Sequence, residues 1–168
     1  AGAFTDAVAP YESALRIFDQ ELQEESEYTA LYIYRYLGNI YTRLGEYRAA
    51  EALLLRSYTV FDELGKSSLA AESCSDLGIL YRAWNKTEQA IEQYQQGIPL
   101  AQEGSISKAL LRTNLAKLYW KEGRYEKVQD ESINAIEILQ LYDPSASYYD
   151  VNQYVATSFE LLARVASQ

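Results

Sequence analysis

One short pattern occurs three times in this chain, and it constrains the fold more than any other feature. Each copy has a leucine, then a small residue, and then a tyrosine four places after the leucine. The copies are Leu37-Gly38-x-x-Tyr41, Leu77-Gly78-x-x-Tyr81 and Leu115-Ala116-x-x-Tyr119. A period of about 40 residues predicts repeated supersecondary units, because no single unit can bury its apolar face without a neighbour.

A second pattern follows each copy at a constant distance. It reads Gly45-x-Tyr47-x-x-Ala50, then Asn85-x-Thr87-x-x-Ala90, then Gly123-x-Tyr125-x-x-Val128. Glycine or asparagine suits the left-handed residue that ends a helix, so each unit is predicted to be two helices joined by a tight turn. The small residue of the first pattern is expected where the two helices of a unit approach each other most closely.

These two patterns together resemble the tetratricopeptide repeat, a helix–turn–helix unit with a usual length of about 34 residues. The resemblance covers about Ala30 to Tyr142, and repeats of this greater length are similar to those of kinesin light chains and of bacterial peptide-receptor and signalling proteins. The chain departs from the family pattern at Val128 and Ser132, and no proline closes a repeat. The resemblance implies an all-α fold, a right-handed α-solenoid that binds other proteins without catalysing a reaction.

The boundaries follow from the repeat positions and from helical periodicity. We expect a single domain over residues 1–168, with a half-repeat at 5–23, three repeats at about 28–64, 67–103 and 106–142, and a capping helix at 147–166. Pro99 falls inside the second helix of the middle repeat, where it predicts a kink or a break.

Composition excludes several classes of function. The formal net charge of −9 argues against nucleic acid as a partner, because phosphate binding needs a basic face. No apolar run approaches the length that a membrane-spanning helix needs, so no membrane insertion is expected. The chain has no histidine, a single cysteine and no glycine-rich phosphate loop, so we expect no catalytic residues, no metal site, no cofactor and no enzymatic activity. Cys74 is expected to be a buried small hydrophobe.

The first residues, Ala-Gly-Ala, indicate either an excised segment or a mature chain from which a targeting peptide has been removed. A cytoplasmic location is favoured, with an organellar or lumenal location as the alternative.

The resemblance implies that the first helices of successive repeats line a concave groove. The side chains expected to point into it are Tyr32, Arg35, Tyr36, Asn39, Thr42 and Arg43, then Glu72, Ser75, Asp76, Ile79 and Arg82, then Leu110, Thr113, Asn114, Lys117, Trp120 and Lys121. The predicted partner-binding residues are Tyr32, Arg35, Tyr36, Asn39, Arg43, Arg82, Asn114, Lys117, Trp120 and Lys121. The groove set holds five cations and two acids, although the whole chain has 24 acids and 15 cations. This inversion predicts a positive groove, because a concavity focuses field lines.

Tetratricopeptide domains with a carboxylate clamp carry a basic residue and an asparagine one turn later, and Arg35 and Asn39 match that pair. The following helices should supply a second asparagine and two bases, but this chain has Asp76, Leu110 and Asn114 at those places. A complete clamp is therefore not predicted.

The favoured function is a non-catalytic scaffold or adaptor that holds a peptide or segment of a partner protein in the groove. The expected ligand has acidic and aromatic or aliphatic residues. Two alternatives stay open: a peptide-sensing regulatory domain of a larger signalling protein, and a structural or assembly subunit of a multiprotein complex.

Overall fold

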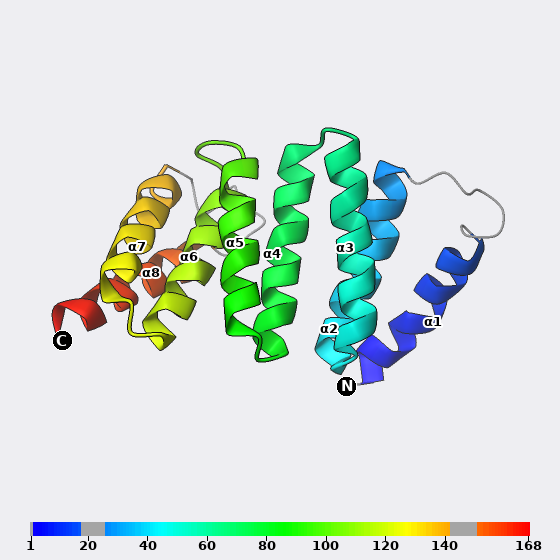
Figure 1. The fold of residues 1–168 in the computed structure, drawn as a ribbon, viewed down its shortest axis with the longest axis horizontal. Helices are drawn as coiled ribbons and strands as arrows, with labels where there is room; N and C mark the ends of the chain where they lie inside the picture. The colour runs from blue at the N-terminus through cyan, green and yellow to red at the C-terminus, as the bar shows by residue number, and fades with distance from the viewer. Residues whose placement is uncertain (1, 18–25, 142–150) are drawn as a thin grey trace. The chain divides into compact units, whose positions relative to one another are not determined.

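The computed structural model describes residues 2–17, 26–141 and 151–168, which form eight α-helices and one π-helical segment, with no strand among them (Figure 1). The all-α repeat fold predicted from the sequence is therefore confirmed. The chain packs as two compact units, Ala1–Gln93 and Tyr94–Gln168, and the division falls within a helix. Each unit is described by itself, and a single functional domain over residues 1–168 stays a prediction.

The first unit contains α1 (Gly2–Ile17), the π-helical segment η2 (Thr29–Arg35), α2 (Tyr36–Leu44), α3 (Tyr47–Glu63), α4 (Ser67–Ala83) and the first part of α5 (Thr87–Leu100). The hydroxyl of Ser26 accepts a hydrogen bond from the Thr29 amide at 3.2 Å, which satisfies a free donor at the start of the first repeat. η2 runs directly into α2, so the first helix of the repeat predicted at about 28–64 is present and includes wider, π-helical turns. The end of the predicted half-repeat, residues 18–23, lies outside the described residues.

The second unit contains the rest of α5, α6 (Ile106–Lys121), α7 (Tyr125–Leu139) and α8 (Val151–Ala166). α5 continues through Pro99 and ends one residue later, three residues before the predicted end of that repeat. α8 packs against α7 and α6, with Val151 in a buried cluster with Ala109 and Leu139. It supplies residues 151–166 of the predicted capping helix, and residues 147–150 lie outside the described part of the chain.

The turn inside each repeat has the same hydrogen-bond pattern. In the first, the amides of Gly45 and Glu46 donate to the carbonyls of Thr42 and Tyr41, at 3.3 and 2.9 Å. The equivalent bonds recur after α4 and after α6. The left-handed residue has φ of 83° at Gly45, 60° at Asn85 and 68° at Gly123. Asparagine thus takes the glycine place in the middle copy, as the sequence predicts.

Gly38 lies where α2 meets α3. A Cβ atom added there would stand 2.7 Å from Cγ of Leu54, which is fully buried. The predicted need for a small residue at this crossing is confirmed.

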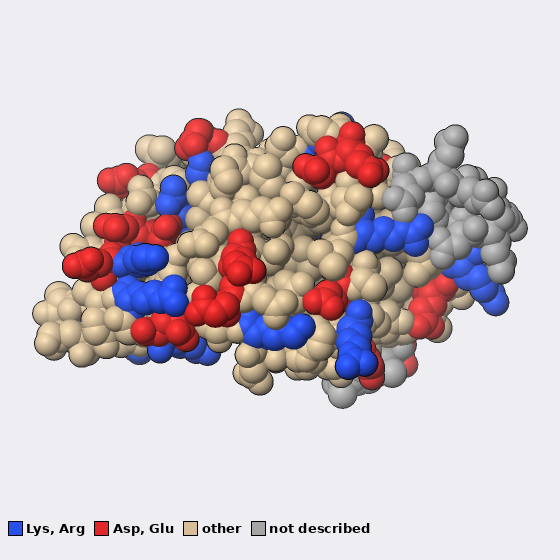
Figure 2. Space-filling view, in the orientation of Figure 1, with Lys and Arg blue, Asp and Glu red and all other residues tan. Residues whose placement is uncertain are grey.

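In Figure 2, acidic and basic side chains are interspersed on the face drawn, and both kinds lie over α7. Within the described ranges, no helix is both long and apolar enough to cross a membrane.

Candidate protein-interaction face

Four tyrosines of the first unit form a row of stacked rings, which we call the tyrosine stack. Its members are Tyr28, Tyr32 and Tyr36, spaced four residues apart, and Tyr11 from α1. Successive ring centroids are 5.8, 6.3 and 6.1 Å apart, and the interplanar angles are 24°, 12° and 5°. Residues four apart lie on the same side of a helix, which explains why the three rings align.

The stack is open to solvent. Tyr28, Tyr32 and Tyr36 expose 74%, 51% and 51% of their surface. Tyr34, between them in sequence, points inward and is fully buried, with the guanidinium of Arg56 4.6 Å from its ring centroid. The segment therefore has one tyrosine in the core and three on the surface, and it includes the π-helical turns. Such turns are rare and often occur at functional sites.

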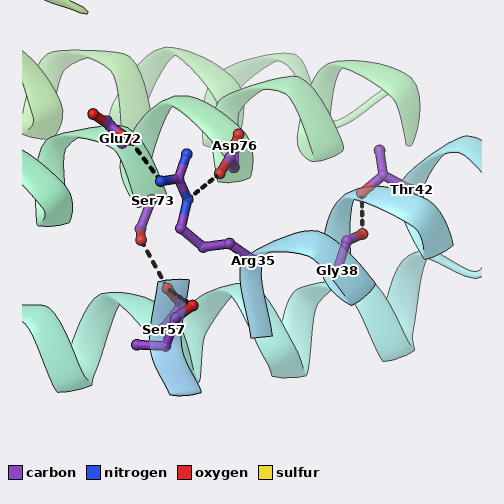
Figure 3. Close-up of polar contacts among 8 residues, drawn as sticks. Arg35, Gly38, Thr42, Ser57, Glu72, Ser73 and Asp76 are labelled. Carbon is purple, nitrogen blue, oxygen red and sulfur yellow. Dashed lines mark hydrogen bonds and ion pairs between the residues drawn. The ribbon is translucent and has the colours of Figure 1, made fainter. Parts of the chain in front are cut away.

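Arg35 lies beside the stack but points toward α4, where it joins two carboxylates (Figure 3). Its Nη1 donates to Glu72 Oε2 at 2.6 Å, and its Nε donates to Asp76 Oδ2 at 2.8 Å. Asn39, one turn further along, also hydrogen-bonds Asp76. We call these four residues the Arg35 network. It connects the first helices of two successive repeats within the first unit.

Burial and charge oppose each other in this network. Burial raises the pKa of the Asp76 carboxyl above its usual value, and the nearby Glu72 adds to the effect, while Arg35 and Asn39 lower it. Burial also acts against the charged form of Arg35, yet Asp76 and Glu72 together leave the pKa of its guanidinium raised. Arg35 therefore stays charged, and the network holds one cation against two carboxylates.

The sequence pair Arg35 and Asn39 thus has a carboxylate bound to it, and that carboxylate belongs to Asp76. The side chain of Asp76 stands in for the ligand carboxylate that a clamp of this kind would hold. Asp76 thus uses the donors that a clamp would offer to the carboxylate of a ligand. Arg35, one of the five cations predicted for the groove, is therefore already paired with carboxylates of its own unit.

The other predicted residues of the first unit lie on the same helices. Arg43 is exposed at the end of α2, and Arg82 is exposed at the end of α4. The structure brings Tyr32 and Tyr36 together, joins Asn39 to Arg35 through Asp76, and leaves Arg82 on the surface.

In the second unit, two of the four predicted residues of α6, Lys117 and Trp120, contact α8. The ammonium of Lys117 lies 5.6 Å from the ring centroid of Tyr154, and the guanidinium of Arg164 lies 5.9 Å from that of Trp120. Trp120 also contacts Tyr125, with centroids 5.3 Å apart. Asn114 is buried, and Lys121 is exposed at the end of the helix. Most of this face is therefore occupied by contacts within the unit.

Sequence reasoning missed Tyr28 and Tyr11. The spacing of Tyr28, Tyr32 and Tyr36 could have identified the first, since it continues the same side of the helix by one more turn. Tyr11 gave no such signal, because its place depends on how α1 packs against α2.

Comparison with known proteins agrees with this description. Residues 28–103 match the family model of the tetratricopeptide repeat, which confirms for this segment the family predicted from the sequence. The crystal structure of BtubC (BKLC) from P. vanneervenii is similar, with a TM-score of 0.75 and 20% sequence identity. The match covers 99% of this chain and 73% of that one, and at this identity it supports the fold alone. No curated protein sequence matches the chain.

Tetratricopeptide repeats generally mediate contacts between proteins and form a non-catalytic scaffold.

Cys74 fits a structural role as well. It is fully buried, and burial, with a smaller contribution from Asp62, raises the pKa of its thiol to about 12. A thiol of this kind is chemically inert at neutral pH.

Proposed function

We propose that this chain is a non-catalytic interaction scaffold that binds a segment of a partner protein on the tyrosine stack of its first unit. The observation that carries the proposal is the exposure of three stacked tyrosines on one side of one helix. Aromatic side chains contribute much of the binding energy of protein interfaces, because they bury a large area and lose little conformational entropy.

The repeat position of these tyrosines supports the proposal. Tyr32 and Tyr36 stand five and one residues before Leu37, as Glu72 and Asp76 stand before Leu77. In α4, the side chains at these two places bind Arg35 of the preceding first helix. In the first repeat, Tyr36 stacks on Tyr11 of α1, and both Tyr32 and Tyr36 remain half-exposed. The tyrosines therefore stand at places that α4 uses for contact between helices.

The chemistry of the face suggests the kind of partner. An apolar hollow of about 480 Å³ lies beside Tyr28 and Tyr32, lined also by Ile17 and Ile33. It suits an aromatic or aliphatic side chain. Arg82 is exposed in the last turn of α4, where it can pair with an acidic residue of the partner.

Partner capture followed by mass spectrometry tests the proposal. The native chain, a Tyr32→Ala, Tyr36→Ala variant and a Leu55→Ala, Leu64→Ala control would be compared at equal concentration. Both variants remove two half-exposed apolar side chains, but the control changes α3 and the residue that follows it.

We expect the tyrosine variant to lose the partner and the leucine control to retain it. Retention by both folded variants would move the binding surface away from the stack. Capture of a short peptide instead of a protein would favour the alternative of a peptide-sensing regulatory domain.

A further inference from the structure

The second unit has an apolar hollow between α7 and α8 that the proposed function does not use. Its volume is about 320 Å³, and its lining residues are Gln129, Ile133, Leu162, Val165 and Ala166. Ile133 exposes 41% of its surface, which is unusual for isoleucine on a helix that also packs against two neighbours. We call this site the α7–α8 hollow.

The packing of α8 explains where the hollow lies in the repeat. α8 contacts α7 and α6 as α4 contacts α3 and α2, so it stands in the place of a first helix. The hydroxyls of Thr113 and Ser158, 3.3 Å apart, fix α8 alongside α6. In a complete repeat, a second helix would pack against both α7 and α8. The hollow therefore continues the helix–helix interface from which the repeats are built.

The small residue of the tight crossing has a counterpart in α8. Ser158 is buried and stands three residues before the buried Leu161, as Gly38 and Ala116 stand three residues before Tyr41 and Tyr119. Leu162, which follows Leu161, lines the hollow.

The charges around the hollow are predominantly acidic. Asp130 and Glu137 lie three residues before and four residues after Ile133, on the same side of α7, and both are exposed. Glu126 extends the row by another turn. The nearby cations have other contacts: Lys127 lies 5.2 Å from the ring centroid of Tyr119, and Arg164 pairs with Glu160 at 2.6 Å.

We propose that the α7–α8 hollow binds a basic amphipathic helix of a partner protein. The apolar side of that helix fills the hollow, and its Lys or Arg residues lie against the acidic row of α7. Charge complementarity and continuity with the repeat interface together define this occupant. The site is separate from the tyrosine stack and does not depend on its function.

Two synthetic peptides, each long enough to form several helical turns, serve as probes. Both have leucine and isoleucine along one side of a helix, and the remaining positions are lysine in one peptide and glutamate in the other. Binding to the full chain would be measured by fluorescence anisotropy at two salt concentrations. Three variants would be compared: Ile133→Glu, Asp130→Lys with Glu137→Lys, and a control, Glu63→Lys with Glu92→Lys, that makes the same charge change in the first unit.

We expect the lysine peptide to bind and the glutamate peptide to bind at least tenfold more weakly. The Asp130 and Glu137 reversal should weaken binding of the lysine peptide about tenfold and improve binding of the glutamate peptide, while the control changes neither by more than about twofold. Ile133→Glu should weaken both, with unchanged circular dichroism.

Equal binding of the two peptides, or binding that none of the variants changes, would overturn the proposal. Self-association of the native chain that Ile133→Glu abolishes would also overturn it, because a second copy would then be the occupant.

Discussion

The first helices of the two units use their aromatic and cationic side chains in different ways. In the first unit, η2 and α2 meet α4 through the ion pairs of Arg35 with Glu72 and Asp76, and three tyrosines remain exposed. In the second unit, α6 meets α8 through Lys117 on Tyr154 and Arg164 on Trp120. In both units, cations of these helices contact other residues of the same unit. Among the described residues, exposed stacked aromatic side chains are found only in the first unit.

This difference shows that residue type alone does not identify a binding face in a repeat protein. Trp120 and Tyr36 are equally good interface residues by composition. What distinguishes them is whether the next helix of the same unit already covers them.

Removing α8 should have the largest effect, because α8 covers the aromatic side of α6. A chain ending at Leu141 loses the buried side chains of Val151 and Leu161, which at about 1.5–3 kcal/mol each predicts a loss of about 3–6 kcal/mol in the second unit. The two tryptophans lie in different units, so Trp84→Phe and Trp120→Phe versions report urea unfolding of each unit separately. The first unit should be unchanged. Equal stability of the second unit with and without α8 would contradict the claim.

Next in size is the effect of removing the cation from each face. Arg35→Ala leaves two carboxylates without their partner, one of them only 13% exposed, and should cost about 2–3 kcal/mol. Lys117→Ala loses one cation–π contact and should cost about 0.5–1 kcal/mol. Urea unfolding measures both. Adding Asp76→Ala to Arg35→Ala should restore part of the stability, and purely additive losses would show that the two side chains are not coupled.

The sequence predicted the parts of this structure that depend on local spacing. The leucine, small residue and tyrosine pattern identified the helix pairs, and Gly45, Asn85 and Gly123 identified the turns. Both signals depend on residues close together in the chain, where helical geometry fixes their relative positions.

The Arg35 network was not predicted, because it depends on tertiary contacts, and the place of Tyr11 in the tyrosine stack depends on them as well. Arg35 and Asp76 are 41 residues apart, and spacing alone could not show that one neutralises the other. The π-helical turns of η2 also had no sequence signal. The sequence therefore predicted a positive groove, although Arg35, one of its cations, is paired with Glu72 and Asp76.

A smaller effect compares the tight crossing in the two units. Gly38→Ala places a methyl group against Leu54 and should cost about 1–2 kcal/mol, because a packed crossing does not accommodate extra volume easily. Ala116→Gly, at the equivalent place in the second unit, removes a buried methyl group and adds chain flexibility, and should cost about 1–2 kcal/mol without any steric conflict. Thermal unfolding followed by circular dichroism measures both. A neutral Gly38→Ala would mean that α2 and α3 can separate without cost.

The last effect, which is confined to alkaline pH, is a loss of stability. Tyr41 is hydrogen-bonded to Glu12 and Tyr81 lies beside Glu51; burial first, and then these carboxylates, raise the pKa of both tyrosines from 10.0 to about 12. Since the folded pKa lies above the unfolded one, this contribution is complete below pH 10 and is lost as the pH rises from 10 to 12. Urea midpoints of the first unit, reported by Trp84, should fall in that interval. The fall should be smaller in a Tyr41→Phe, Tyr81→Phe variant, and an identical fall would assign the effect to other groups.

The central claim is that the exposed tyrosines of the first unit bind the partner and that the covered aromatic face of the second unit does not. The most direct test is isothermal titration calorimetry of the captured partner with two folded variants, Tyr32→Ala with Tyr36→Ala and Lys117→Ala with Trp120→Ala. We expect at least a tenfold loss of affinity for the tyrosine variant and less than a twofold change for the other. A tenfold loss in the Lys117 and Trp120 variant with the tyrosine variant unchanged would contradict it.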